Sequence, residues 1–144
     1  MKLLISEVLQ KVSNAKTKAQ KIKLLQDHNG PALRSLLIAS YDESANCLLP
    51  EGEVPYTPND APKGVQLTYL EREFRQLRLF YQGGGSNLTP LRREALFIQL
   101  LEGLHADEAE VVCLAKDKSL NKKYRITRQV IEEAFPQIVW GKRS

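Results

Sequence analysis

The sequence predicts an all-α domain, and three observations lead to this prediction. Apolar residues recur every three or four positions along most of the chain, as they do on the buried face of an amphipathic helix. No segment shows the strict alternation of apolar and polar residues that is typical of a half-buried strand. Capping residues, prolines and glycines stand where the periodic segments begin and stop. We therefore expect a compact bundle of about seven helices with one long Pro-rich strap.

The length and composition are those of one domain over residues 1–144. The chain has 144 residues, 42% of them hydrophobic, which is enough for one core and too few for two ordinary domains. No apolar run reaches the roughly 18 residues of a membrane span, and the first residues lack the apolar region of a signal peptide. We therefore expect a cytoplasmic protein. Cys47 and Cys113 lie in apolar stretches and are interpreted as reduced core residues, with a disulfide as the less favoured alternative.

The first 45 residues predict three helices. Each has apolar residues at helical spacing, and the second also carries a lysine-rich stretch over residues 16–23. Pro31 suits the first turn of the third helix, because its missing N–H would have no partner there in any case. The apolar positions are Leu3, Leu4, Val8, Leu9 and Val12 in the first helix, Ala19, Ile22, Leu24 and Leu25 in the second, and Leu33, Leu36, Leu37 and Ile38 in the third.

A Pro-rich loop follows over residues 44–66. Four prolines and two glycines exclude a continuous helix or a central strand here. The interleaved Leu48, Leu49, Val54 and Tyr56 are too apolar for a plain linker, so we expect the loop to pack back on the helices. A functional loop and a structural strap are both compatible with this composition.

Residues 67–81 predict one amphipathic helix with arginines beside its apolar face. The arginines recur at three-residue spacing and have two interpretations. They could form a phosphate-binding ridge, or they could be solvated and paired with Glu71 and Glu73, which is the favoured interpretation. The apolar positions are Leu67, Leu70, Phe74, Leu77 and Tyr81, and the arginines are Arg72, Arg75 and Arg78.

Three further helices are predicted in the second half of the chain. Residues 83–85, all glycine, end the preceding helix; Thr89 then caps a helix that Gly103 ends, and Asp107 caps the next, which finishes near Lys116. Thr127 caps a short last helix, which stops before a tail over residues 136–144. The residues expected inward are Leu91, Ala95, Ile98 and Leu101, then Ala109, Val112, Cys113 and Leu114, then Val130, Ile131, Ala134 and Phe135, with Trp140 anchoring the tail.

The sequence offers little that could be gathered into a catalytic centre. It has no Gly-x-Ser-x-Gly elbow, no His-Glu-x-x-His pair, no Cys-x-x-Cys pair, and too few histidines and cysteines for a structural zinc site. His105 is expected to be a local cap or an exposed side chain. Asp107, Glu108 and Glu110 are explained by the positive end of a helix dipole. We therefore expect a protein that is not an enzyme and uses no cofactor or metal.

The distribution of charge favours an anionic partner. Residues 1–30 carry a net charge of +4, residues 31–115 carry −5, and residues 116–144 carry +5. Near the last helix six cations surround Tyr124, whose ring could lie in the same site. Such a cluster suits a nucleic-acid backbone, and a solvated basic loop is weighed equally. The candidate nucleic-acid-binding residues are Lys116, Lys118, Lys122, Lys123, Arg125 and Arg128.

Two resemblances are carried by particular segments. Residues 48–53, 100–105 and 115–118 resemble a family of small proteins of tailed phages, especially marine and cyanobacterial phages. More distantly, the order of segments and the closing stretch over residues 126–136 resemble the all-helical N-terminal DNA-binding domain of ATP-dependent DNA ligases of T-even-type phages. In those ligases this domain grips duplex DNA beside a nick, and a separate domain performs the chemistry.

The resemblance implies a DNA-binding role without ligase activity, because the chain has no Lys-x-Asp-Gly adenylation motif. It implies DNA contacts by Lys122, Lys123, Arg125 and Arg128, although the glycine typical of the ligase turn is absent here. We expect a phage accessory protein in the host cytoplasm that binds intact or nicked duplex DNA, largely independently of sequence. The alternative is a protein–protein interaction module that docks on a replication, transcription or virion component through Val54, Pro55 and Tyr56.

Overall fold

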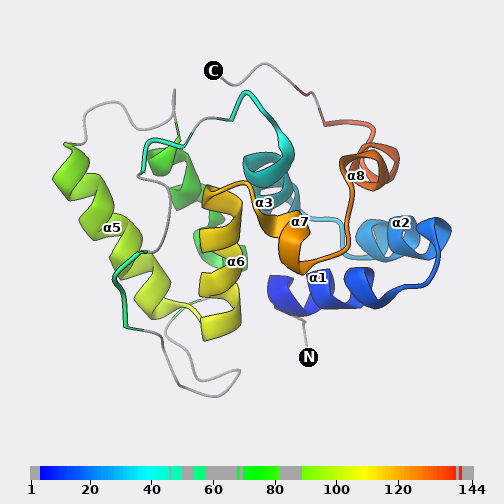
Figure 1. The fold of residues 1–144 in the computed structure, drawn as a ribbon, viewed down its shortest axis with the longest axis horizontal. Helices are drawn as coiled ribbons and strands as arrows, with labels where there is room; N and C mark the ends of the chain where they lie inside the picture. Colours follow the sequence, from blue (N-terminus) through cyan, green and yellow to red (C-terminus); the bar gives the residue numbers. More distant parts are fainter. Residues whose placement is uncertain are drawn as a thin grey trace.

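The structure is a computed structural model, and it describes residues 4–45, 47–49, 54–57, 68, 70–81, 89–138 and 140. The described residues form eight α-helices and one 3₁₀ helix, with a single isolated β-bridge (Figure 1). The all-α prediction is confirmed. The elements are α1 (Ile5–Asn14), α2 (Lys18–Asp27), α3 (Pro31–Tyr41), α4 (Leu70–Glu73), the 3₁₀ helix η1 (Phe74–Phe80), α5 (Pro90–Gly103), α6 (Ala106–Lys116), α7 (Leu120–Lys123) and α8 (Arg128–Ala134).

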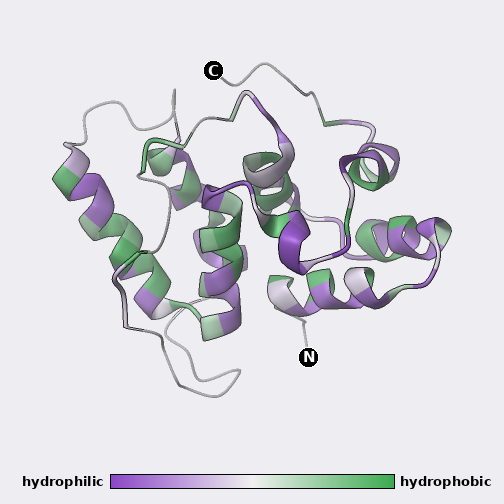
Figure 2. Cartoon of the chain, in the orientation of Figure 1, coloured by the Kyte–Doolittle hydropathy of each residue, from purple (hydrophilic) through white to green (hydrophobic). Residues whose placement is uncertain are grey.

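Helices α3 and α6 pack against each other in the middle of the molecule (Figure 1). On one side α5 packs on α6, and η1 packs on α3 and α5. On the other side α1 packs on α2 and α6, and α8 packs on α2. The helices carry hydrophobic and hydrophilic residues in alternating bands, as amphipathic helices do (Figure 2). The buried bands join in one hydrophobic core.

The three predicted N-terminal helices are confirmed. Most of the predicted apolar positions of α1 and α3 are buried, and Leu9, Leu25 and Leu36 have no exposed surface. In α2 Leu25 is buried, but Ile22 and Leu24 are half-buried and Ala19 is exposed, so the expected apolar face is only partly covered. The predicted Leu3 lies outside the described residues. The hydroxyl oxygen of Thr17 accepts a hydrogen bond of 3.2 Å from the backbone N–H of Gln20 and so caps α2. Pro31 occupies the first turn of α3, as expected.

The segment over residues 70–81 differs from the single α-helix that was predicted. Only Leu70–Glu73 is α-helical, and Phe74–Phe80 continues as a 3₁₀ helix. A three-residue apolar repeat is compatible with this conformation, because a 3₁₀ helix places residues i and i+3 on one line. Phe74, Leu77 and Phe80 thereby face the core, and the Phe80 ring meets Phe97 edge-on with centroids 5.0 Å apart. The predicted Leu67 and the glycines at 83–85 lie outside the described residues.

The described parts of the Pro-rich loop pack on the helices, as expected. Leu49, Val54 and Tyr56 contact the core, although Leu48 is 43% exposed. The loop is fixed by backbone hydrogen bonds from Leu48 N to Phe80 O at 2.8 Å and from Thr57 N to a Glu102 carboxylate oxygen at 2.8 Å. In its described part the loop is therefore held against the helices, as expected.

Cys47 and Cys113 are half-buried, and neither forms a disulfide within the part of the chain that the structure describes. Burial raises the pKa of the Cys47 thiol and raises the pKa of Cys113 to about 11. Both thiols are therefore protonated at neutral pH, the form that is inert as a nucleophile.

Helix α5 has the predicted bounds but turns a different face to the core. Leu91 is 79% exposed and Ala95 is also exposed, whereas Phe97, Leu100 and Leu101 are buried. Leu91 and Ala95 belong to the first two turns of α5, where the helix extends beyond the elements that cover its later turns (Figure 1). The prediction that they point inward was therefore wrong.

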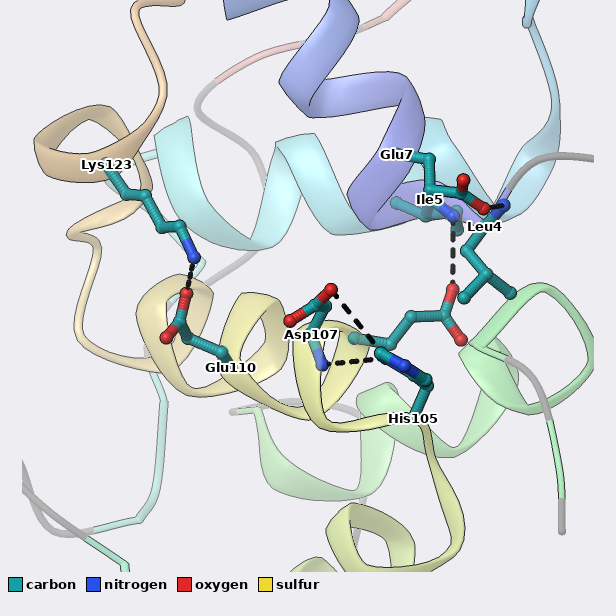
Figure 3. Close-up of polar contacts among 8 residues, drawn as sticks. Leu4, Ile5, Glu7, His105, Asp107, Glu110 and Lys123 are labelled. Carbon is teal, nitrogen blue, oxygen red and sulfur yellow. Dashed lines mark hydrogen bonds and ion pairs between the residues drawn. The ribbon is translucent and has the colours of Figure 1, made fainter. Parts of the chain in front are cut away.

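Helix α6 is capped by His105 and not by Asp107. The Nδ1 atom of His105 accepts a hydrogen bond of 3.1 Å from the backbone N–H of Asp107 (Figure 3). This confirms the local role expected for His105. Asp107 itself is an exposed residue of the first turn, where its charge suits the helix dipole.

Glu108 joins three helices, which the sequence did not indicate. Its side chain is buried, with 1% of the residue exposed. One carboxylate oxygen accepts a hydrogen bond of 3.1 Å from the N–H of Ile5, the first residue of α1 (Figure 3). The other accepts a hydrogen bond of 3.1 Å from the N–H of Leu70, the first residue of α4. One side chain on α6 thus accepts a hydrogen bond from the first N–H group of each of two other helices.

Two absences hold for the part of the chain that the structure describes. None of its helices combines the length and the apolar sequence that crossing a lipid bilayer requires. No three of its histidine, cysteine or acidic side chains come together as metal ligands.

Candidate nucleic-acid interface

Two of the six candidate cations hold the fold together. Lys116 lies at the end of α6 and is 6% exposed, and its Nζ lies 2.6 Å from Oδ1 of Asp117. Lys118 follows in the left-handed conformation, with φ of 53°. A residue in this conformation closes a Schellman motif, in which Ser119 N donates to Leu114 O at 2.8 Å and Lys118 N donates to Ala115 O at 3.1 Å.

The Lys118 ammonium offsets the cost of that conformation. Its Nζ donates hydrogen bonds to the carbonyl oxygens of Ala39 at 3.1 Å and Asp42 at 2.8 Å, at the C-terminal end of α3. The last carbonyls of a helix have no intrahelical partner and carry negative partial charge, so an ammonium group suits them. Glycine is the usual residue at this position of the motif because it has no Cβ. The contact with α3 therefore explains why lysine suits this position.

We expect Lys118→Ala to lower the free energy of unfolding by about 2 kcal/mol, because it leaves two carbonyls without their charged donor and keeps the strained φ. Lys118→Gly loses the same donor, but glycine adopts the positive φ without strain. The decrease in the free energy of unfolding should therefore be smaller than for Lys118→Ala. Urea denaturation of the three proteins measures both differences. Equal stability of Lys118→Ala and the unsubstituted protein would contradict this role.

Lys123 and Arg128 each lie beside a carboxylate. The ammonium of Lys123 contacts the carboxylate of Glu110 on α6 (Figure 3), and this hydrogen bond raises the pKa of Lys123. The Nε atom of Arg128 lies 3.1 Å from a carboxylate oxygen of Glu132, one turn further along α8. The Arg128 guanidinium also lies over the ring of Trp140, 4.6 Å from its centroid. Trp140 packs against the core, as predicted.

Lys122 and Arg125 are the freest of the six. Both are exposed, and neither side chain has an ion pair with another described residue. Lys122 belongs to α7, a single helical turn in the basic stretch before the last helix, where no helix was predicted. Arg125 belongs to the extended stretch between α7 and α8.

The backbone around Arg125 is held by the N-terminal helices. Its N–H donates a hydrogen bond of 2.9 Å to the hydroxyl oxygen of Ser13, at the end of α1. Its carbonyl oxygen accepts a hydrogen bond from the ammonium of Lys21, on α2. One residue further, the carbonyl of Ile126 accepts a hydrogen bond of 2.7 Å from the Tyr41 hydroxyl. The connection before α8 is thus fixed by three other helices.

Helix α8 is tied to α2 by two further polar contacts. The ammonium of Lys18 lies 2.5 Å from a carboxylate oxygen of Glu133. The side-chain amide of Gln26 donates a hydrogen bond of 3.3 Å to the carbonyl of Ala134. The basic N-terminal segment and the basic C-terminal segment therefore lie side by side, on the α2 and α8 side of the molecule (Figure 1).

The Tyr124 ring lies within the cluster, with the Nζ of Lys123 5.6 Å from its centroid, but it is not exposed to a ligand. It is 2% exposed and belongs to the core. The stretch from Tyr124 to Ile126 alternates between core and surface, and Arg125 is the residue that points outward. Removal of the ring from water explains the position of Tyr124, because a fully buried aromatic side chain contributes several kcal/mol of hydrophobic stabilisation.

We define the basic surface as the cations that meet at this junction and keep exposed surface. They come from α2, α7, the connection and α8. Lysine and arginine side chains of this kind contact phosphate oxygens, which positions a nucleic acid without reading its bases. The basic surface consists of Lys21, Lys122, Lys123, Arg125 and Arg128.

The strap residues proposed for docking are mostly committed to the fold. Val54 and Tyr56 are half-buried and pack against the core, and Pro55 between them is exposed. Burial raises the pKa of the Tyr56 hydroxyl, which lies beside the thiol of Cys113. The two apolar side chains of this motif are therefore largely used within the molecule.

Comparison with known proteins gives one match. The model of a family of unknown function (DUF6433) matches residues 8–122, from α1 to α7. No curated protein and no solved structure matches the chain.

Proposed function

Since the chain belongs to this family of unknown function, we propose its function from its own surface: the protein binds duplex DNA through the basic surface, largely independently of base sequence, and catalyses no reaction. The remote resemblance of its segment order to the DNA-binding domain of phage ligases supports the same role, and the resemblance of residues 48–53, 100–105 and 115–118 to tailed-phage proteins supports a phage origin. In that setting the protein is an accessory protein of the host cytoplasm during infection.

The observation that carries the proposal is the junction at Arg125. Ser13 and Lys21 hold the backbone of Arg125 on either side of the residue, which brings the two positively charged ends of the sequence to one place. A single basic segment of this size would be an ordinary solvated surface. Two such segments side by side raise the local positive potential, and that favours an extended polyanion.

The geometry favours a duplex over single-stranded nucleic acid. Proteins that bind single strands combine cations with exposed aromatic rings on which bases stack. At the basic surface the Tyr124 ring is buried, and one face of Trp140 is already occupied by Arg128. Cations on a fixed backbone suit the regular phosphate positions of a double helix, which they contact without base readout.

We test the proposal by fluorescence anisotropy with labelled intact duplex, nicked duplex and single-stranded DNA of one sequence, each over a series of salt concentrations. We expect the logarithm of the association constant for duplex to fall linearly with the logarithm of the salt concentration. The double substitution Lys122→Ala and Arg125→Ala should reduce the slope by about 2 and weaken binding on every duplex sequence alike. The single strand should bind more weakly than either duplex.

The matched control removes two exposed lysines elsewhere. Lys11 and Lys23 line a separate open groove between α1 and α2. Lys11→Ala with Lys23→Ala has the same change in net charge and should leave the slope within about 0.5 of the original. An equal effect of both double variants would assign binding to net charge and remove the basic surface from the proposal. Absence of binding at low salt would direct the search to acidic protein partners.

A further inference from the structure

A row of three exposed arginines lies on α4 and η1, away from the basic surface. Arg72 belongs to α4, and Arg75 and Arg78 belong to η1. The sequence left two interpretations for these residues, a phosphate-binding ridge and solvated arginines paired with Glu71 and Glu73. The structure bears on both, through the type of helix and through the positions of the carboxylates.

The 3₁₀ conformation aligns the arginines. In an α-helix three residues turn through about 300°, so each arginine would be displaced by about 60° from the one before it. In a 3₁₀ helix three residues complete one turn and rise about 6 Å, so Arg75 and Arg78 lie on one line along η1. The row of Phe74, Leu77 and Phe80 on the core side fixes the rotation of η1 and leaves the arginines outward.

The favoured interpretation expected the arginines to pair with Glu73, but the described part of the structure shows no such pair. The carboxylate of Glu73 accepts hydrogen bonds from the Thr68 hydroxyl at 3.0 Å and from the Gln76 side chain, so it is directed along another edge of the helix. Within the described residues none of the three arginines has an ion pair or a hydrogen bond from its side chain. Arg75 makes one cation–π contact, 5.7 Å from the centroid of the Phe74 ring.

The arginine row and the basic surface lie on different elements of the fold. Helix η1 packs on α3 and α5, whereas the basic surface lies on α2 and α8, which pack on each other, and on α7, which packs on α6. Helices α3 and α6 lie between these two groups (Figure 1). A rigid duplex bound along the basic surface therefore leaves the arginine row available to a different segment of nucleic acid.

We propose that Arg72, Arg75 and Arg78 form a second phosphate-binding surface, so that one protein molecule joins two segments of duplex DNA. The inference rests on the proposed function for its first segment. Arginine suits this role, because its planar guanidinium donates two parallel hydrogen bonds to a phosphate. Arg75 and Arg78 lie about 6 Å apart along η1, and duplex DNA carries one charge per about 1.7 Å of its axis, so several phosphates lie within reach of the row.

The test is a bridging assay with the full chain. One biotinylated duplex is immobilised on beads, and recovery of a second, fluorescent duplex is measured with and without protein. We expect recovery with the unsubstituted protein. The triple substitution Arg72→Gln, Arg75→Gln and Arg78→Gln should lower recovery at least tenfold, while affinity for a single labelled duplex at limiting DNA changes less than threefold. The matched control, Lys11→Gln, Lys23→Gln and Arg92→Gln, removes three exposed cations elsewhere and should retain recovery within twofold.

The outcomes separate this inference from the proposed function. Full recovery with the triple arginine variant would overturn the second surface and show that bridging arises by self-association. If single-duplex binding is lost in the triple variant and kept in Lys122→Ala with Arg125→Ala, the proposed function fails at the basic surface. Two-site joining then fails with it, because only one site remains. Single-duplex binding without recovery of a second duplex would overturn this inference alone and would favour an acidic protein as the partner of the row.

Discussion

Replacing Glu108 with alanine should lower the free energy of unfolding by about 4 kcal/mol, because two N–H groups that are buried beside it lose their acceptor. An unpaired buried donor costs about 1 to 3 kcal/mol, and here one substitution leaves two of them, at the starts of α1 and α4. Urea or guanidinium denaturation monitored by circular dichroism measures the loss.

Glu110 provides the control on the same helix. It is exposed and pairs with Lys123 at the surface, so Glu110→Ala should change the free energy of unfolding by less than about 1 kcal/mol. A loss below about 1 kcal/mol in Glu108→Ala would show that the two N–H groups find other partners and that Glu108 is not the junction of the three helices.

The same residue predicts a dependence on pH. Burial raises the pKa of Glu108 above its ordinary value of 4.5, so the folded state holds the proton more tightly than the unfolded state. The stability from this difference is complete below the ordinary pKa and is lost as the pH rises through the higher, folded-state value. The unfolding free energy of the unsubstituted protein minus that of Glu108→Gln should therefore decrease as the pH rises above the ordinary pKa of 4.5. A difference that increases with pH would contradict the direction of the shift.

The second large effect is expected for Tyr124, whose ring is buried below the basic surface. Tyr124→Ala should lower the free energy of unfolding by about 3 to 5 kcal/mol, because it leaves a cavity where an aromatic ring filled the core. The stretch that carries Arg125 would lose its anchor, so DNA affinity should fall as well. Thermal denaturation and anisotropy measure the two effects.

Tyr124→Phe separates packing from contact with a ligand. It keeps the ring and removes only the hydroxyl, so stability should change by less than about 1 kcal/mol and DNA affinity should stay the same. Weaker DNA binding by a stable Tyr124→Phe variant would place the hydroxyl at the interface and would restore the role that the sequence suggested for this residue.

The helices were predictable wherever an apolar face coincided with capping residues. Helices α5 and α8 combine both features, because Thr89 and Thr127 cap them through their hydroxyl oxygens as predicted. Helix α1 follows Leu4, which makes no side-chain cap, so it was predictable from its apolar spacing alone. The 3₁₀ helix was not predictable in this way, because apolar residues three apart fit one turn of either helix type. At α5 the periodicity was correct but the inward face was not, since the sequence does not show how far a helix extends beyond its neighbours.

The candidate site was less predictable, because charge alone does not show what an ammonium contacts. Lys116, Lys118 and Lys122 are alike in sequence, yet the first is buried, the second caps α3 and only the third is exposed and without a carboxylate partner among the described residues. The contact between Lys21 and Arg125 joins residues 104 positions apart, and such pairs have no local pattern. Glu108 was missed for the same reason, since its partners Ile5 and Leu70 are 103 and 38 residues away.

The clamp around Arg125 also bears on when the basic surface comes into existence. Ser13 and Lys21 must meet a stretch more than 100 residues later, so the entropy of closing a long loop is lost before these contacts form. On a ribosome, a growing chain would expose its early lysines while their later partner is still unmade. The basic surface is thus complete only when the whole chain has folded. Partly synthesised chains, which lack Arg125 and its neighbours, would not compete for its ligand.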